Sequence, residues 1–195
     1  MPSLMKDPIK NTIRTSYIQV REKLPLDYQT TVSSQVCNKI KQLEPYRYAK
    51  KIALYHACKG EIDLSELWSS APMQGKFCYF PVMNKDKTLS FLPTTPATEF
   101  KKNAYGILEP QVALSEAESP EEIDLIFMPL VAFDNQGTRI GMGAGYYDRT
   151  LANKNHPLLI GVAYEFQQHS LLPTQKWDIP LAAIVTEKKV YWTSK

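Results

Sequence analysis

The stretch Leu125-Ile126-Phe127-Met128-Pro129-Leu130-Val131-Ala132-Phe133 is an unbroken run of nine apolar residues. A parallel strand that is covered on both faces is apolar at nearly every position, so this run predicts the central strand of a sheet. Shorter apolar runs at 52–55, 158–162 and 181–185 predict further strands, with helical patterns between them. Strands that alternate with helices indicate an α/β fold with a mostly parallel central sheet flanked by helices, a Rossmann-like three-layer sandwich.

Two helices are expected before this sheet begins. A first helix ends near Pro25, and a second runs from an N-cap at Asp27 to Pro45. The buried stripe of the first helix is expected to comprise Ile9, Ile13, Tyr17, Val20 and Leu24. Lys10, Arg14 and Arg21 fall together at the rim of that stripe.

Further elements follow from the same patterns. The residue pair Asp63 and Glu66 predicts the start of another helix, and a helical pattern covers 146–153. Strands are expected at 77–80 and 89–92, and they are close enough in sequence to pair across the polar turn at 84–87.

Length and composition limit the class of protein. The chain has 195 residues, of which 44% are hydrophobic and 22% charged, and it has no apolar run of the length needed to cross a bilayer. We expect a single domain over residues 1–195, cytoplasmic and monomeric, with no membrane partner. The net charge is +3, and the whole surplus lies in the first 24 residues. A surplus this small does not favour a nucleic-acid partner.

The densest motif follows the central strand. Gly141, Gly143 and Gly145 alternate there, so side chains are missing where backbone N–H groups could converge on an anion at the start of a helix. This pattern indicates a phosphate-binding loop, although its spacing matches neither the Walker A nor the dinucleotide-binding fingerprint. A tight strand-to-helix turn explains the spacing equally well.

Two charged residues flank these glycines. The Arg139 guanidinium could bind phosphate oxygens, and the Asp148 carboxylate would need a cation such as Mg²⁺ beside an anionic ligand. A salt bridge between the two across the loop is the alternative.

At this motif the sequence becomes similar to a known family. The segment Arg139-Ile140-Gly141-Met142-Gly143-Ala144-Gly145-Tyr146-Tyr147-Asp148-Arg149 resembles the signature of the 5-formyltetrahydrofolate cyclo-ligases, also called methenyltetrahydrofolate synthetases. The likeness extends to 10–14, 61–63, 105–110, 129–134, 177–180 and 186–187. It implies ring closure of 5-formyltetrahydrofolate to 5,10-methenyltetrahydrofolate with ATP and Mg²⁺. In that scheme the formyl oxygen takes the γ-phosphoryl group of ATP and a folate nitrogen attacks the activated carbon.

The resemblance also implies roles for individual residues. The ATP-binding residues would be Lys10, Arg14, Arg139, Ile140, Gly141, Met142, Gly143, Ala144, Gly145, Tyr146 and Tyr147. The folate-binding residues would be Glu61, Tyr105, Met142, Gly143, Ala144, Gly145 and Tyr146. Arg139 would act in catalysis, and Asp148 and Asp178 would bind Mg²⁺.

For several of these residues the sequence alone leaves another interpretation open. Glu61 could accept hydrogen bonds from the amino-pyrimidine ring or be a solvated loop charge, and Asp178 could be a turn residue before Pro180. Tyr146 could stack on the pterin, whereas Tyr147 fits a core position equally well. Two residues depart from the family pattern. Ala144 stands where members of the family have a lysine or a glycine, and Ala182 stands where an aspartate is common.

Two other functions are compatible with the sequence. The first is an α/β enzyme that handles a sugar phosphate or a CoA ester without ATP, because a fold does not fix a function. The second is a nucleic-acid-binding protein that uses its basic first helix, which would require salt-sensitive affinity.

Overall fold

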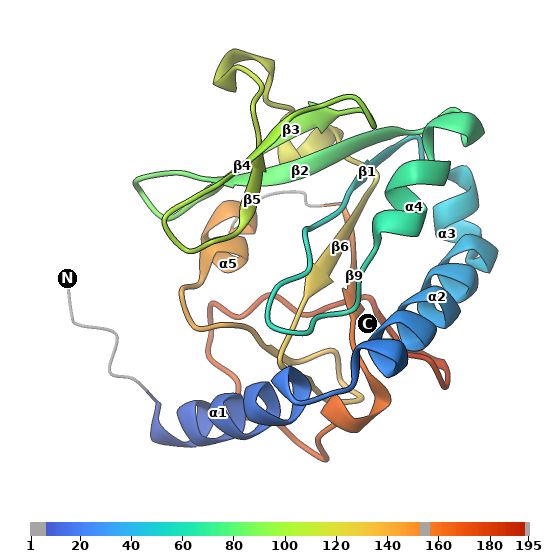
Figure 1. Ribbon diagram of the computed structural model, residues 1–195. Coiled ribbons are helices and arrows are strands. Elements are labelled where there is room, and N and C mark those ends of the chain that lie inside the picture. The colour runs from blue at the N-terminus through green and yellow to red at the C-terminus, as the bar shows by residue number, and fades with distance from the viewer. Residues whose placement is uncertain (1–6, 153–156, 194–195) are drawn as a thin grey trace.

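The computed structural model describes residues 7–152 and 157–193, and its centre is a seven-stranded sheet in the order β11-β10-β9-β6-β1-β2-β3 (Figure 1). The strands are β1 (Lys51–Ala53), β2 (Phe77–Met83), β3 (Leu89–Thr94), β6 (Leu125–Pro129), β9 (Leu158–Val162), β10 (Ala183–Val185) and β11 (Val190–Trp192). The five inner strands are parallel, and β3 and β11 are antiparallel edge strands. This arrangement confirms the expected α/β fold with a mostly parallel sheet.

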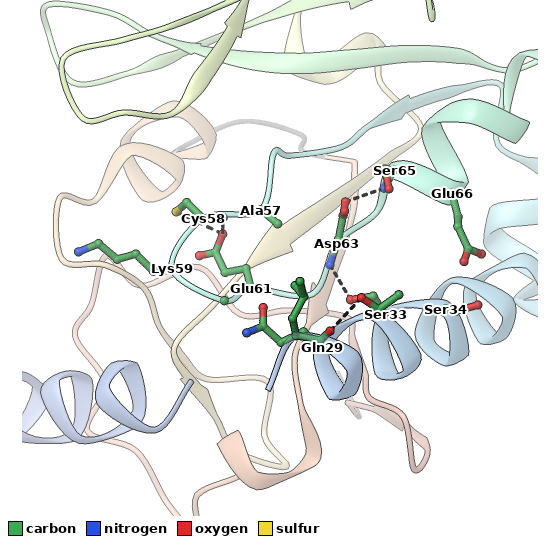
Figure 2. A pocket seen from close by; sticks show the side chains of 13 residues that line it. Gln29, Ser33, Ser34, Ala57, Cys58, Lys59, Glu61, Asp63, Ser65 and Glu66 are labelled. Carbon is green, nitrogen blue, oxygen red and sulfur yellow. Dashed lines mark hydrogen bonds between the residues drawn. The ribbon is translucent and has the colours of Figure 1, made fainter. Parts of the chain in front are cut away.

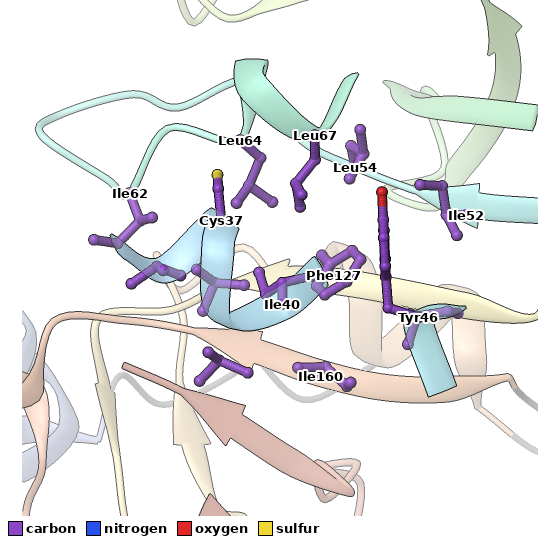
Figure 3. Close-up of a cluster of buried hydrophobic side chains, with 14 of the residues drawn as sticks. Cys37, Ile40, Tyr46, Ile52, Leu54, Ile62, Leu64, Leu67, Phe127 and Ile160 are labelled. Atoms are coloured by element: carbon purple, nitrogen blue, oxygen red, sulfur yellow. The ribbon is translucent and has the colours of Figure 1, made fainter. Parts of the chain in front are cut away.

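Helices cover both faces of this sheet. The helices α2 (Leu26–Gln42), α3 (Glu44–Tyr48) and α4 (Ser65–Ser70) lie on one face, where Cys37, Ile40 and Tyr46 pack with Phe127 and Ile160 of the sheet (Figure 3). The helix α5 (Tyr146–Leu151) lies on the other face, in the cluster that contains Ile126 and Met128. Alternate residues of β6 thus fill two separate cores, as the continuous apolar run requires.

The first helix begins as the sequence indicates, but its buried stripe differs from the expected one. In α1 (Pro8–Glu22) the Asp7 side chain accepts from the backbone N–H of residues 9 and 10. Ile9 and Val20, which we expected to be buried, are 62% and 49% exposed. Arg21, expected at the rim, is 1% exposed. The stripe is rotated because α1 packs on loops that carry polar groups, and Arg21 reaches their carbonyls.

The central strand is shorter than its apolar run. β6 ends at Pro129, and β7 (Ala132–Phe133) pairs instead with β8 (Arg139–Ile140) in a two-stranded sheet. The reason is that other groups take the intervening carbonyls: Arg21 and Gln167 both donate to the Leu130 carbonyl, and Gln167 also donates to that of Val131. The expectation of one strand over 125–133 is therefore wrong.

The second helix also begins and ends at other residues than expected. α2 begins at Leu26 with Pro25 as N-cap, so Asp27 lies inside the first turn. Pro45 does not close α2 but lies in the first turn of α3. The expected pairing of 77–80 with 89–92 is confirmed by the β2–β3 hairpin.

One hairpin and the short elements were not predicted. β4 (Phe100–Lys102) and β5 (Leu108–Pro110) form an antiparallel pair. Single 3₁₀ turns are η1 (Pro72–Gln74), η2 (Leu114–Glu116), η3 (Pro120–Glu122) and η4 (Glu165–Gln167). Among the helices of the described residues, none combines the length and the hydropathy of a membrane span.

The sheet order indicates where a ligand would be expected to bind. From β1 the chain continues to its neighbour β2 on one side, whereas from β6 it continues to β9 on the other side. The direction of the connections therefore reverses between β1 and β6. Ligands of parallel α/β sheets bind at the carboxyl ends of the strands at such a point, and here that position belongs to the loops after β1 and β6.

Candidate functional site

The glycine loop that follows β8 lies against α1. Gly143 and Gly145 have φ angles of 98° and 68°, which residues with a side chain rarely adopt. Arg14 Nε donates to the Gly141 carbonyl at 2.8 Å, and a Cβ atom added at Gly143 would lie 3.1 Å from Arg14 Cζ. The loop therefore keeps its backbone close to a guanidinium, and a side chain at 143 would fill the space between them.

The loop also has unused hydrogen-bond donors. Within residues 7–152 and 157–193, the backbone N–H groups of residues 141–145 donate to no protein acceptor. Met142 and Ala144 are exposed. The helix that follows, α5, has six residues and offers only a small dipole, so the amides and the nearby arginines are the main attraction for an anion.

Two ion pairs join the predicted cationic and anionic residues. Arg139 Nη2 lies 2.6 Å from Asp148 Oδ1, and Arg139 Nη1 donates to the Ile179 carbonyl. Lys10 Nζ lies 2.6 Å from Asp178 Oδ2. The salt bridge left open for Arg139 and Asp148 is thus present, and the Asp178 side chain also accepts from the Gln175 amide within its turn.

These ion pairs place α1, the glycine loop and the segment 175–179 around one position. Among the described residues there is no group of three or more His, Cys, Asp or Glu side chains that could hold a metal by themselves. Mg²⁺ does not need such a group, because it is commonly held by one or two carboxylates together with phosphate oxygens and water. The pair Asp148 and Asp178 therefore suits a magnesium–triphosphate complex better than a bare ion.

Glu61 is buried, so the interpretation as a solvated loop charge is wrong. Its Oε1 lies 3.4 Å from Arg21 Nη2, and its Oε2 accepts from the backbone N–H of Cys58 at 3.0 Å. Burial raises the pKa of Glu61, and the Arg21 charge and the Cys58 amide oppose that rise. The same burial, with Glu61 nearby, raises the pKa of Cys58 to about 12.

A cavity of about 240 Å³ lies beside this carboxylate (Figure 2). One wall is the loop after β1 with the Glu61 and Asp63 side chains, continued by the first residues of α4. The other wall is the first part of α2, with Gln29 and Ser33. The Ser33 hydroxyl accepts from the Asp63 amide at 3.0 Å, which ties the two walls together. The buried carboxylate thus borders open space in a rigid polar setting.

Three tyrosines link Glu61 to the glycine loop and to the β4–β5 hairpin. Burial raises the pKa of Tyr147, and the negative charge of Glu61 contributes to that rise. Burial also raises the pKa of Tyr146, with the neighbouring Tyr105 hydroxyl as the next cause. Tyr105 lies between β4 and β5 and is 72% exposed. Tyr146 and Tyr147 both pack against the core cluster beneath them.

Most of the predicted site residues therefore lie near one another. Ile140 differs from the others because its side chain points into the core. It is buried with Val131, Ala132 and Leu172, so only its backbone could face a ligand. Arg21 was not predicted as a site residue. The sequence signal that could have indicated it is that Arg21 lies on the same side of α1 as Arg14. An arginine on the buried side of a helix is almost always paired with an acidic group.

The hairpin that carries Tyr105 was missed as well. Asn103 Oδ1 accepts from the amides of Tyr105 and Ile107, and Asn103 Nδ2 donates to Glu109. Gly106 completes this turn with a φ of 77°. The asparagine followed by a glycine three residues later was the available turn signal.

Comparison with known proteins gives one consistent result. The model of the 5-formyltetrahydrofolate cyclo-ligase family matches residues 6–187. A 5-formyltetrahydrofolate cyclo-ligase of Haemophilus influenzae is 40% identical over 180 residues, which are 90% of this chain and 96% of that relative. One of Escherichia coli (strain K12) is 34% identical over 177 residues, 89% of this chain and 97% of that relative.

The similar solved structures are also of proteins named as methenyltetrahydrofolate synthetases. The NMR structure of a 5,10-methenyltetrahydrofolate synthetase from Aquifex aeolicus has a TM-score of 0.83 and 36% identity, and covers 96% of this chain and 94% of its own. A 5,10-methenyltetrahydrofolate synthetase from Mycoplasma pneumoniae has a TM-score of 0.73 and 26% identity, and covers 91% of this chain and 98% of its own. The likeness to these solved structures therefore extends over nearly the whole chain.

Proposed function

Because this chain belongs to the 5-formyltetrahydrofolate cyclo-ligase family, we propose that it closes 5-formyltetrahydrofolate to 5,10-methenyltetrahydrofolate in a reaction that consumes ATP and requires Mg²⁺. The family that the motif at 139–149 indicated is confirmed, and the chain is an enzyme of the ligase class. The observation that carries the finer proposal is the glycine loop, with unused backbone amides and two ion pairs beside it.

On the ATP side, the residues of this chain bind and orient phosphate. The amides of residues 141–145 offer donors in a fixed backbone geometry, and Arg14 is already held against the loop by the Gly141 carbonyl. Lys10 and Arg139 add positive charge from two further directions. When bound, ATP would supply the phosphoryl group that activates the formyl oxygen, a reaction that depends mainly on positioning and charge neutralisation.

The carboxylates Asp148 and Asp178 would hold Mg²⁺. In the ligand-free protein each of them has a cationic partner, Arg139 and Lys10 respectively. A magnesium–triphosphate complex brings one cation and several anionic oxygens, so it offers both carboxylates and both basic groups a new partner of opposite charge. No charged group need be left unpaired when the complex binds.

On the folate side, Glu61 would accept hydrogen bonds from the amino-pyrimidine ring. Tyr146 would stack on the pterin, and Tyr105 would approach from the β4–β5 hairpin. The Tyr146 hydroxyl is neutral at physiological pH, because a phenol ordinarily ionises near pH 10 and burial raises its pKa further. A neutral phenol suits a stacking surface, because it adds no charge beside the phosphate site.

An absorbance assay for the methenyl product tests this proposal. Purified protein is mixed with 5-formyltetrahydrofolate, ATP and Mg²⁺, and each component is left out in turn. Product is expected only in the complete mixture, with ADP formed in equal amount. Product formed without ATP would refute the nucleotide requirement. Folded protein that yields none from the complete mixture would refute the activity.

A further inference from the structure

Arg21, at 1% exposed, is the most completely buried basic residue in the part of the chain that the structure describes, and three acceptors surround it. Its Nε donates to the Lys59 carbonyl at 2.9 Å, its Nη1 to the Leu130 carbonyl at 2.9 Å, and its Nη2 lies 3.4 Å from Glu61 Oε1. Lys59 lies in the loop after β1, and Leu130 lies directly after β6. One side chain from α1 therefore ties together the two loops at which the sheet connections reverse.

Stability alone explains this arrangement poorly. A buried ion pair contributes little to folding, because the desolvation of both charges cancels much of their attraction. Apolar side chains of similar volume at both position 21 and position 61 would fill the space without that cost. The guanidinium instead provides directional hydrogen bonds to two loops and a fixed charge beside one carboxylate.

We propose that Arg21 is a positioning residue for folate recognition, which fixes the Glu61 carboxylate in its ionised form between the loops after β1 and β6. This inference rests on the proposed function, in which Glu61 accepts hydrogen bonds from the amino-pyrimidine ring. A carboxylate accepts at both oxygens, whereas a protonated carboxyl group loses acceptor capacity. Recognition of a ring that presents N–H donors therefore requires the ionised form.

The surroundings of Glu61 show why a counter-charge is needed. The titratable groups that face it are Arg21 of α1, Tyr55 beyond β1, Cys58 and Lys59 of the loop, and Tyr147 of α5. Burial raises the pKa of Glu61, and Arg21 is the strongest influence in the opposite direction. Without Arg21 this pKa rises further, so a larger fraction of Glu61 is protonated near neutral pH.

The test compares Arg21→Met and Arg21→Lys with Lys23→Met, which removes the same charge from an exposed position at the end of α1. KM is measured for 5-formyltetrahydrofolate and for ATP between pH 6 and pH 9, and the folate Kd is measured by quenching of tryptophan fluorescence. We expect Arg21→Met to raise the folate KM and Kd about tenfold at pH 7, and the ATP KM to stay within twofold. The folate defect should shrink as the pH rises.

Two comparisons separate this role from a structural one. Arg21→Lys keeps the charge and should retain most of the folate affinity, and Lys23→Met should match the wild type. Glu61→Gln should bind folate weakly at every pH, and adding Arg21→Met to it should remove the pH dependence that Arg21→Met shows alone. Circular dichroism and thermal melting verify that each variant folds; if Arg21→Met does not fold, Arg21→Lys with Glu61→Gln decides the question.

The outcomes are distinct. A folded Arg21→Met with wild-type folate KM, or with a defect that does not change with pH, would overturn the inference. If the wild type binds folate but forms no product, the cyclo-ligase proposal fails, and the inference is judged from Kd alone. If the wild type binds no folate, both fail.

Discussion

Gly60 offers a direct test of how closely the Glu61 loop is fitted to α1. It has a φ of 70°, and a Cβ atom added there would lie 2.7 Å from the Arg21 carbonyl oxygen and 3.2 Å from its carbonyl carbon. That carbonyl accepts from the Leu24 amide at the end of α1, so it cannot move without breaking a backbone hydrogen bond. Gly60→Ala therefore has to shift the loop.

The expected loss of stability has two parts. A residue with a side chain in the left-handed region costs about 1 kcal/mol, and relief of the overlap costs about 1–3 kcal/mol more. Gly75 is the matched control, because its φ is 69° and nothing lies within 4 Å of an added Cβ. Gly75→Ala should therefore cost only the first part. At about 3 °C per kcal/mol for a chain of this size, an extra 2 kcal/mol lowers the melting temperature of Gly60→Ala by about 6 °C relative to Gly75→Ala.

Thermal melting and steady-state kinetics together test this expectation. A shifted loop moves the Lys59 carbonyl and Glu61 away from Arg21, so Gly60→Ala should also raise the folate KM while the ATP KM stays near that of Gly75→Ala. Equal melting temperatures for the two alanine variants, with equal folate KM values, would show that the loop is not fixed against α1 and would refute the reasoning.

Three further predictions concern charge. Asp148→Asn should lower turnover at least about 100-fold, since it removes a proposed Mg²⁺ ligand, and it should change the melting temperature little. Turnover is measured at saturating substrate concentrations, and an unchanged value would exclude Asp148 as a ligand. ATP should bind at least about tenfold more weakly without Mg²⁺ in a calorimetric titration, and equal affinities would contradict the exchange of ion pairs. His56 lies among Trp68, Phe80 and Phe100, and burial lowers its pKa. Below its unfolded pKa near 6.5, this residue therefore binds more protons in the unfolded chain than in the folded one. Its contribution to stability is complete above that pH and is lost as the pH falls from there through the lower pKa of the folded state. His56→Phe should flatten the dependence of the melting temperature on pH between 7 and 5.5, and identical pH curves would contradict this.

The sheet could be predicted because its signal is local. A strand covered on both faces must be apolar along its whole length, and β6, β9 and β10 each meet that condition within a few residues. The end of β6 could not be predicted in the same way, because it depends on which groups take the Leu130 carbonyl. Those groups are Arg21 and Gln167, which lie 109 and 37 residues away in the sequence.

In the candidate site, too, contiguous features could be predicted from the sequence, whereas contacts between distant residues could not. The glycine loop is contiguous, so its spacing and its flanking charges could be recognised directly. The partner of Lys10 is 168 residues away, and the partner of Glu61 is 40 residues away. Resemblance to a family predicts that Glu61 binds folate, but only the structure shows that Glu61 is paired with a buried arginine. Arg21 was misplaced because helical periodicity sorts side chains by polarity, and a paired arginine is buried despite its charge.

The ion pairs give a physical reason why the proposed substrate and metal would act as one ligand. Separating Lys10 from Asp178 or Arg139 from Asp148 leaves a partly buried charge without a partner, which is unfavourable in a site of low exposure. ATP alone could take the two basic groups but would leave two carboxylates unpaired beside its phosphates, and Mg²⁺ alone would leave the two basic groups unpaired. The complex of both satisfies all four groups at once. Affinity of the site for either component must then depend on the other by the same factor, because the coupling of two binding equilibria is reciprocal.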